Sequence, residues 1–220
     1  MKRADTALRT RRRILQAAAE LFSEHGYGQT TLRAIAERAG VSVESVGLAG
    51  PKRRLAFSAF TMAFAGHGEA FPLTGEPAYV ELMQRMPLPE AIDEYIALLA
   101  GAIARTHRLW RALRAAADAD PVAATMLDDV RAERRREFER SAQTVVELGL
   151  AAEEDVPLLV REFFAIATHE VYDLLNTECG MTPAEYRERL RRQMWNLLRE
   201  VNVGRTSPET DAGDFHLAMR

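Results

Sequence analysis

The sequence of residues 30–55 is TTLRAIAERAGVSVESVGLAGPKRRL, and this stretch decides the fold of the N-terminal part of the chain. Apolar side chains recur at three- and four-residue spacing over residues 32–39, which predicts one face of a helix. A turn at Gly40–Val41 follows, and Ser42 can cap a second helix that stays short because two glycines weaken it. Two short helices joined in this way have the spacing of a helix-turn-helix, whose second helix enters the DNA major groove. Such a turn is also common as plain packing, so by itself it leaves both interpretations open.

Helical patterns continue on both sides of this stretch. One helix is predicted from Thr6 to His25, where Gly26 can end it, and Pro51 opens another that runs to about Ala65. Residues 66–89 are rich in glycine and proline, which is typical of a loop. Further helices are predicted near residues 89–106, 107–118, 121–149, 155–177 and 183–203. Because no strand-like alternation or internal repeat occurs, the predicted fold class is all-α.

The distribution of charge along the chain separates its N-terminal end from the rest. Residues 1–55 carry eleven basic and five acidic side chains, a net charge of +6, whereas residues 56–220 carry 18 and 27, a net charge of −9. A basic end is a candidate for binding a polyanion. We therefore expect a helix-turn-helix domain at residues 1–55, a larger helical domain at residues 56–203 and a disordered polar tail at residues 204–220.

Composition excludes several other classes of protein. The chain is 47% hydrophobic and 28% charged, so it can bury a sizeable core. Its longest apolar run, residues 96–104, is too short to span a membrane, and its basic N-terminus lacks the apolar stretch of a secretory signal. The single cysteine, Cys179, cannot form an intrachain disulfide. These features predict a cytoplasmic protein.

A longer pattern surrounds the helix-turn-helix. It consists of Arg11-Arg12-Arg13-Ile14-Leu15-Gln16-Ala17-Ala18, Leu21-Phe22, Gly26-Tyr27, Thr30-Thr31-Leu32-Arg33-Ala34-Ile35-Ala36, Ala39-Gly40-Val41-Ser42 and Lys52-Arg53-Arg54-Leu55. This combination of residues at fixed spacing resembles the DNA-binding domain of the TetR family of transcriptional regulators. The resemblance implies a ligand-responsive, dimeric repressor whose C-terminal helical domain binds the effector and dimerises.

The sequence departs from this family where the third helix ends. The family has an aromatic Tyr, then a His or Tyr and a Phe, before its Lys, whereas this chain has Gly47-Leu48-Ala49-Gly50-Pro51-Lys52, one residue fewer. The change removes an aromatic phosphate contact and a packing anchor. The change therefore affects how the third helix docks on DNA more than whether the chain binds DNA.

Cations at the start of the fourth predicted helix are candidate phosphate contacts. Lys52, Arg53 and Arg54 lie in its first turn, where the helix dipole makes each cation unfavourable by about 0.3–1 kcal/mol. A bound phosphate would be attracted by these charges, by the dipole and by the free backbone N–H groups. Lys52 and Arg53 are therefore predicted to bind DNA; the alternative is a solvated triplet paired with acids elsewhere.

The exposed positions of the third helix are predicted to face the bases, and they are Val43, Glu44, Ser45 and Gly47. Val43 could touch a thymine methyl group. Glu44 could accept a hydrogen bond from cytosine N4, or as an acid in the first turn it could simply stabilise the helix. The resemblance places Arg33 near the DNA edge. Thr31 and Ser42 are predicted mainly as helix caps that could also bind phosphate.

The larger helical domain is predicted to dimerise and to bind a small molecule. The last two predicted helices carry apolar faces that could form a four-helix interface between two subunits. The two DNA-binding heads, the helix-turn-helix domains of the two subunits, would then lie ~34 Å apart on a pseudo-palindromic operator. A small, largely apolar effector is expected where aromatic and polar groups converge. The candidate contacts are His107, Trp110, Met126, Phe163, His169 and Tyr172, each of which could instead be ordinary core or surface.

Two other functions compete with this prediction. An enzyme on a helical bundle would need catalytic motifs, but Glu-x-x-His, His-Glu-x-x-His and Gly-x-Ser-x-Gly are all absent. No catalytic residue, cofactor or metal site is therefore predicted. The other alternative is an adaptor or ligand-binding protein that kept the bundle but lost DNA binding, which the altered segment at residues 47–50 would favour.

Overall fold

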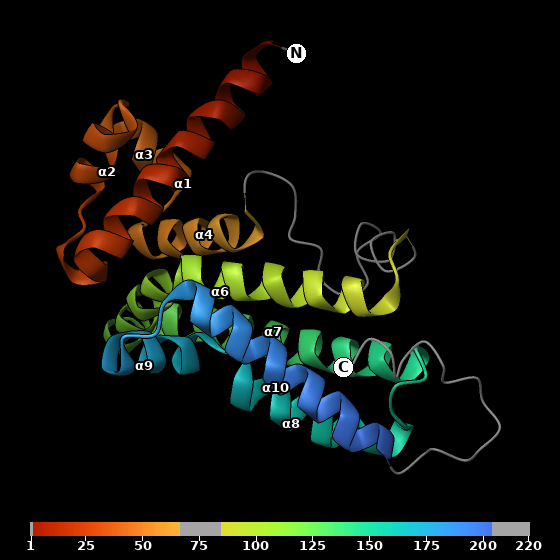
Figure 1. Cartoon of the computed structure of the whole chain (residues 1–220). Helices are drawn as coiled ribbons and strands as arrows, with labels where there is room; N and C mark the ends of the chain where they lie inside the picture. The colour runs from red at the N-terminus through yellow and green to blue at the C-terminus, as the bar shows by residue number, and fades with distance from the viewer. Residues whose placement is uncertain (1, 67–84, 204–220) are drawn as a thin grey trace. The chain divides into compact units, whose positions relative to one another are not determined.

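The computed structural model describes residues 2–66 and 85–203, and the regular elements of these residues are all helices (Figure 1). They are α1 (Lys2–Gln29), α2 (Leu32–Ala39), α3 (Val43–Ala49), α4 (Lys52–Ala65), α6 (Leu88–Ala119), α7 (Pro121–Glu147), the short 3-10 helix η1 (Glu153–Asp155), α8 (Val156–Ile166), α9 (His169–Cys179) and α10 (Pro183–Val203). The all-α fold class predicted from the sequence is confirmed. The predicted tail and most of the predicted loop before α6 lie outside the described residues.

The described residues divide into two compact units. The first consists of residues 2–66 with 105–132, and the second of residues 85–104 with 133–203. Helices α6 and α7 each contribute one part to each unit. The N-terminal helices therefore share their unit with the end of α6 and the start of α7, while the domain boundary expected after residue 55 stays a prediction.

In the first unit, α2 and α3 lie beside α1 (Figure 1). Helix α1 is interrupted at Gly26, whose φ of 72° is a left-handed conformation that glycine adopts without steric cost. The buried hydroxyl of Thr30 donates hydrogen bonds to the carbonyl oxygens of Leu21 and Gly26, at 3.1 and 2.8 Å. These bonds satisfy carbonyl groups near the interruption and fix the entry of the chain into α2.

One hydrophobic core joins the helices of the first unit. Apolar side chains of α1, α2 and α4 pack with the C-terminal part of α6 and the first turns of α7; the largest fully buried ones are Ile14, Phe22, Ile35, Leu55, Leu109, Trp110 and Leu113. The rings of Phe60 and Trp110 lie 5.7 Å apart and tie α4 to α6. Such burial contributes about 1.5–3 kcal/mol for each large side chain.

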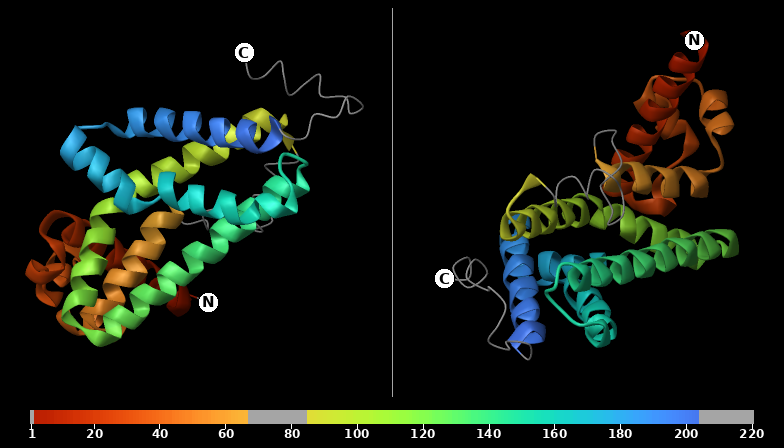
Figure 2. Two further views of the ribbon diagram at one scale, coloured as in Figure 1. Left: turned by 90° about the horizontal axis from the view of Figure 1, so that it is seen from below. Right: turned by 90° about the vertical axis from the view of Figure 1, so that its right-hand side faces the viewer.

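Two helix boundaries predicted for the chain after α4 are wrong. The helices expected near 89–106 and 107–118 form the single helix α6, because no glycine or proline lies between them. The helix expected over 155–177 is broken into α8 and α9, since Thr168 leaves the helical conformation and its hydroxyl accepts from the Val171 N–H. In the second unit α8 and α10 pack on each other, and α9 connects them (Figure 2).

Candidate functional site

The α2–α3 pair has the capped geometry of a helix-turn-helix. Thr31 Oγ1 accepts a hydrogen bond from the Ala34 N–H at 3.1 Å, and Ser42 Oγ accepts one from the Ser45 N–H at 3.1 Å. The predicted capping roles of Thr31 and Ser42 are therefore confirmed. Gly40 ends α2 with a φ of 64°, and its N–H bonds back to the helix. Local hydrogen bonds thus fix both the length of each helix and the turn between them.

Two arginines of α1 hold the C-terminal ends of these short helices. Arg13 donates to the carbonyl oxygens of Ala39 and Gly40, and Arg11 donates to the carbonyl oxygen of Ala49 at 3.2 Å. Cations at helix C-termini satisfy carbonyl groups and oppose the negative end of the dipole. The sequence pattern contains Arg11 and Arg13 but does not predict these contacts, because contacts across 26 or 38 residues have no local signal.

One side of α3 is open to solvent and the opposite side anchors it. Val46 is completely buried, whereas Val43 is 49% exposed and Leu48 is 84% exposed. A Cβ at Gly47 would meet no atom within 4 Å, so the surface beside it is open. Glu44 is exposed and Ser45 is half-buried, its hydroxyl 2.9 Å from that of Ser42.

Leu48 was not among the residues predicted to face the bases. The sequence predicts that the third helix stays short because Gly47 and Gly50 weaken its continuation, and Leu48 falls at its end. The structure continues α3 to Ala49, which places Leu48 one turn beyond Glu44. The four-residue spacing between Glu44 and Leu48 could therefore have indicated that both lie on the same exposed side of the helix.

The three cations at the start of α4 have different surroundings. Lys52 Nζ lies 4.4 Å from the centre of the Tyr27 ring and donates to the carbonyl oxygen of Gly28 at 3.3 Å, and burial lowers its pKa. Arg53 Nη1 lies 3.3 Å from the Asp120 carboxylate. Arg54 is exposed. Pro51 precedes the helix without a side-chain cap, so the first N–H groups of α4 are not bonded by a capping side chain.

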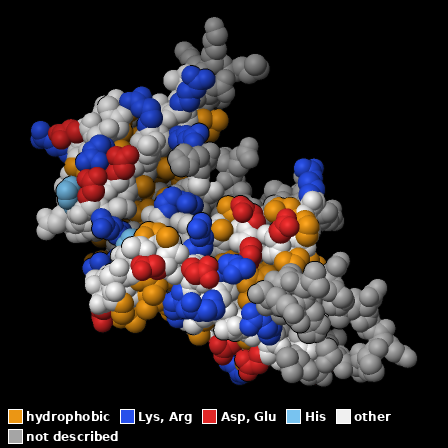
Figure 3. All heavy atoms as spheres, viewed as in Figure 1, with side chains coloured by type: hydrophobic (Ala, Val, Ile, Leu, Met, Phe, Trp, Pro, Cys, Tyr) orange, Lys and Arg blue, Asp and Glu red, His pale blue; other side chains and the backbone are white. Residues whose placement is uncertain are grey.

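Basic and acidic side chains lie side by side on the surface of α1 and α2 and form ion pairs (Figure 3). The predicted DNA-edge residue Arg33 pairs with Glu37 at 2.9 Å, and both side chains are largely exposed. Arg38 pairs with Glu20 and Glu24, which holds the pKa of the Glu24 carboxyl below its usual range. Exposed pairs of this kind are worth about 0–1 kcal/mol, so Arg33 can leave Glu37 for a phosphate at little cost.

A partly open cavity lies within the second unit. Its wall is mostly apolar, with Ile92, Ile96, Phe163, Met194 and Leu198 among the lining residues. Hydroxyl groups of Tyr95, Ser141 and Thr144 form its polar part. The Ser141 hydroxyl donates to the Glu137 carbonyl, so the hydroxyl of Tyr95, 3.4 Å away, is the donor to Ser141.

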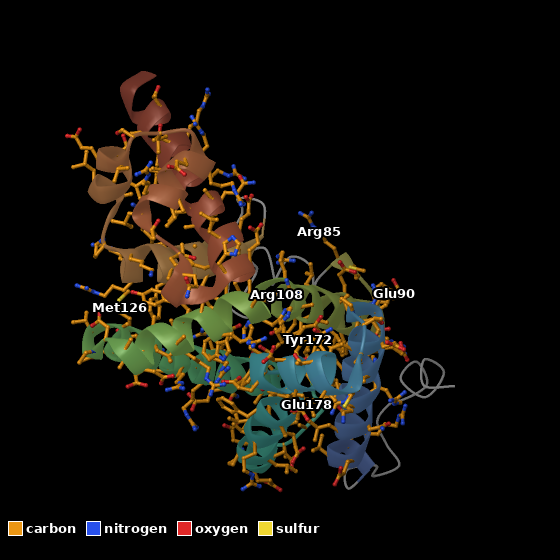
Figure 4. All side chains as sticks on the ribbon, turned by 90° about the vertical axis from the view of Figure 1, so that its left-hand side faces the viewer. Arg85, Glu90, Arg108, Met126, Tyr172 and Glu178 are labelled. Atoms are coloured by element: carbon orange, nitrogen blue, oxygen red, sulfur yellow. The ribbon has the colours of Figure 1, made fainter. Side chains whose placement is uncertain are left out.

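The six predicted effector contacts are divided between the two units. His107, Trp110 and Met126 belong to the first unit, where Trp110 is core and Met126 packs against that core. In the second unit Phe163 lines the cavity described above, whereas His169 and Tyr172 are buried on α9. Tyr172 lies inside this unit (Figure 4), and its ring meets that of Tyr186 edge-on at 4.8 Å.

The described residues contain neither a metal-binding cluster nor a membrane-spanning helix. No group of three or more His, Cys, Asp or Glu side chains among them could hold a metal ion. None of the helices in residues 2–66 and 85–203 combines the length and apolar character of a membrane span.

Comparison with known proteins matches the N-terminal part of the chain to one family. Residues 14–46, from the middle of α1 to the buried anchor of α3, match the model of bacterial regulatory proteins of the tetR family. No curated protein matches the chain.

Proposed function

We propose that the chain, whose residues 14–46 match the tetR family of bacterial regulatory proteins, is a DNA-binding transcriptional repressor released from its operator by a small molecule. The observation that carries the proposal is the open face of α3, set on a buried anchor at Val46 and flanked by cations. Of these cations, Lys52 and Arg54 stand at the uncapped start of α4, where helix dipole and N–H groups favour a phosphate. A DNA-binding protein of this kind acts in the cytoplasm.

The operator is a pseudo-palindrome bound by a homodimer. Two heads related by a two-fold axis read half-sites ~34 Å apart, and each subunit contributes one α3. The apolar stripe of α10 is buried within its own subunit, at Tyr186, Leu190 and Leu197, so the dimer contact uses other residues of the second unit. Leu174 on α9 is 53% exposed and is one candidate. A monomer at micromolar concentration by light scattering would contradict this part of the proposal.

The effector is a small, uncharged and largely apolar molecule that carries a hydrogen-bond donor. The cavity of the second unit supports this choice, because its wall is mostly apolar and carries a few hydroxyl groups. The hydroxyl hydrogens of Ser141 and Thr144 are donated to carbonyl groups one turn earlier, so their oxygens can accept from a ligand. Binding there lowers operator affinity by favouring a head spacing that does not fit the half-sites.

Selection from random duplex DNA tests the DNA-binding part. The purified chain is incubated with the library at low salt, and bound fragments are recovered and sequenced. We expect enrichment of an inverted repeat, and weaker enrichment with Lys52→Gln/Arg54→Gln, which removes two cations beside α3. An unenriched library from folded protein would overturn the proposal and favour the adaptor.

A panel of uncharged apolar compounds, with and without a donor group, tests the effector part. We expect the donor-bearing members to raise the melting temperature and to lower operator affinity. Leu148→Trp is the matched variant, because Leu148 lines the cavity, is 36% exposed, and can be enlarged without overpacking the core. If the same compounds act equally on Leu148→Trp, the effector does not bind in this cavity.

A further inference from the structure

The face that α3 presents has an unusual chemical composition. At 100° per residue, Val43, Gly47, Glu44 and Leu48 fall in this order within an arc of about 140°. All four are exposed, and the buried Val46 lies on the opposite side. Two of these residues are apolar, one has no side chain and one is an acid, so the arc contains neither a cation nor an amide.

This composition excludes the commonest ways of reading a base. Arginine or lysine reads guanine, and asparagine or glutamine reads adenine, through paired hydrogen bonds in the major groove. None of these side chains lies on the exposed arc of α3. The contacts that remain are apolar contact with the C5-methyl group of thymine and acceptance by Glu44 from cytosine N4.

Val43 and Leu48 are the two apolar groups of this arc. Leu48 has the largest exposed fraction among the large hydrophobic side chains that the structure describes, and Val43 is half-exposed one turn before Gly47. A single exposed leucine is ordinary on a protein surface. Val43 and Leu48 lie at the two ends of this arc, on either side of Gly47 and Glu44, and the missing Cβ at Gly47 leaves open space beside Val43.

We propose that α3 recognises its half-site chiefly through thymine methyl groups, one contacted by Val43 and another by Leu48. The two residues are five positions apart, which is about 7.5 Å along the helix axis. Because this separation exceeds the 3.4 Å between neighbouring bases, the two side chains contact different thymines. The inference rests on the proposed function, because it specifies what the DNA-binding head selects.

Replacing thymine by uracil in the selected operator tests the proposal directly. Deoxyuridine lacks only the methyl group and keeps the pairing and the O4 acceptor. Each thymine of the duplex is replaced in turn, symmetrically in both half-sites, and the dissociation constant is measured at fixed salt. We expect a loss of about four-fold per methyl group, hence about 16-fold for a symmetric pair, at two positions of the half-site.

Two variants connect each position with one side chain. Leu48→Ala and Val43→Ala should each bind the thymine duplex more weakly, and each should lose sensitivity to uracil at one position while keeping it at the other. Both residues are exposed, so the variants fold, and melting temperatures check this. Val122→Ala, which shortens a 52% exposed side chain of α7, is the matched control and should behave as the parent chain.

The outcomes separate this inference from the function on which it rests. An operator that binds equally well with uracil at every position would overturn methyl recognition and leave DNA binding intact. Sensitivity that persists in the Val43→Ala/Leu48→Ala double variant would also overturn it, since the methyl group would then act through duplex shape. A chain that selects no duplex at all refutes the proposed function itself.

Discussion

The ammonium group of Lys52 on α4 packs over the ring of Tyr27 near the end of α1, 4.4 Å from its centre. The same group donates to the Gly28 carbonyl oxygen. These contacts hold the cation at the uncapped N-terminus of α4, and burial lowers its pKa by disfavouring the charged form. We propose that a cation held in this way is positioned for a DNA phosphate before binding.

Lys52→Gln should make DNA binding less sensitive to salt. Each lost phosphate contact reduces the slope of log affinity against log salt by about 0.9, so a dimer should lose about two units. Filter binding or fluorescence anisotropy at several salt concentrations measures the slope. Arg187→Gln, which removes an exposed cation from α10, should leave it unchanged. An unaltered slope in Lys52→Gln would mean that this ammonium group serves only the protein.

Asp120 has two partners that can be separated by substitution. Its carboxylate pairs with Arg53, with 28% and 36% of the two side chains exposed, and it also accepts from the Val122 N–H at 2.8 Å to cap α7. Asp120→Asn keeps a good capping residue, so it should cost less than about 1 kcal/mol, whereas Asp120→Ala should cost about 1 kcal/mol more. Urea unfolding of both variants measures the difference.

The same substitution decides whether Arg53 can contact DNA. In Asp120→Asn the guanidinium loses its charged partner, so we expect a steeper salt dependence of DNA binding, by about 0.9 for each released arginine. Adding Arg53→Gln should abolish the increase. If Asp120→Asn binds with the parent slope, Arg53 is a structural residue that ties α4 to the turn before α7.

The two valines of α3 should respond in opposite ways to truncation. Val46→Ala removes two buried methyl groups and leaves a cavity, so it should destabilise the chain by about 2 kcal/mol. Val43→Ala should change the free energy of unfolding by less than about 0.5 kcal/mol, because the side chain is half-exposed. Chemical denaturation gives both values. Equal losses of stability would show that α3 packs differently.

The start of α10 should contribute a pH-dependent stability. The Thr182 N–H donates to Glu185 at 2.8 Å and the Thr182 hydroxyl at 2.7 Å, which lowers the pKa of this carboxyl from its ordinary value of 4.5. Because the folded pKa is the lower one, the stabilisation is present above about pH 4.5 and is lost as pH falls through the folded pKa.

Glu185→Gln removes this proton-linked contribution while keeping an acceptor for the cap. We expect its melting temperature to fall less steeply with acidification than that of the parent chain. Glu188→Gln removes one exposed carboxylate from the same helix and is the control. If the melting temperatures of Glu185→Gln and the parent chain fall equally steeply at acidic pH, Glu185 does not supply this pH-dependent stability.

Local chemistry explains which features could be predicted. The caps at Thr31 and Ser42 and the interruption at Gly26 depend on residues within a few positions, so the pattern contained them. Leu48 was missed because its exposure depends on whether α3 continues past Gly47. The break at Thr168 was missed as well, because a threonine cap without glycine or proline is a weak signal.

The sequence by itself determined an all-helical chain with a basic helix-turn-helix at its start, since spacing, capping residues and charge act over one or two turns. Only the tertiary structure decided which side chains meet. Packing placed Trp110 in the core of the first unit with Met126 against it, and paired Arg53 with Asp120 across 67 residues. It also assembled a cavity from four helices that includes Phe163 alone of the six expected contacts. The physical reason is that periodicity fixes the face on which a residue lies, whereas the neighbour of that face is set by how whole helices bury their apolar surface together.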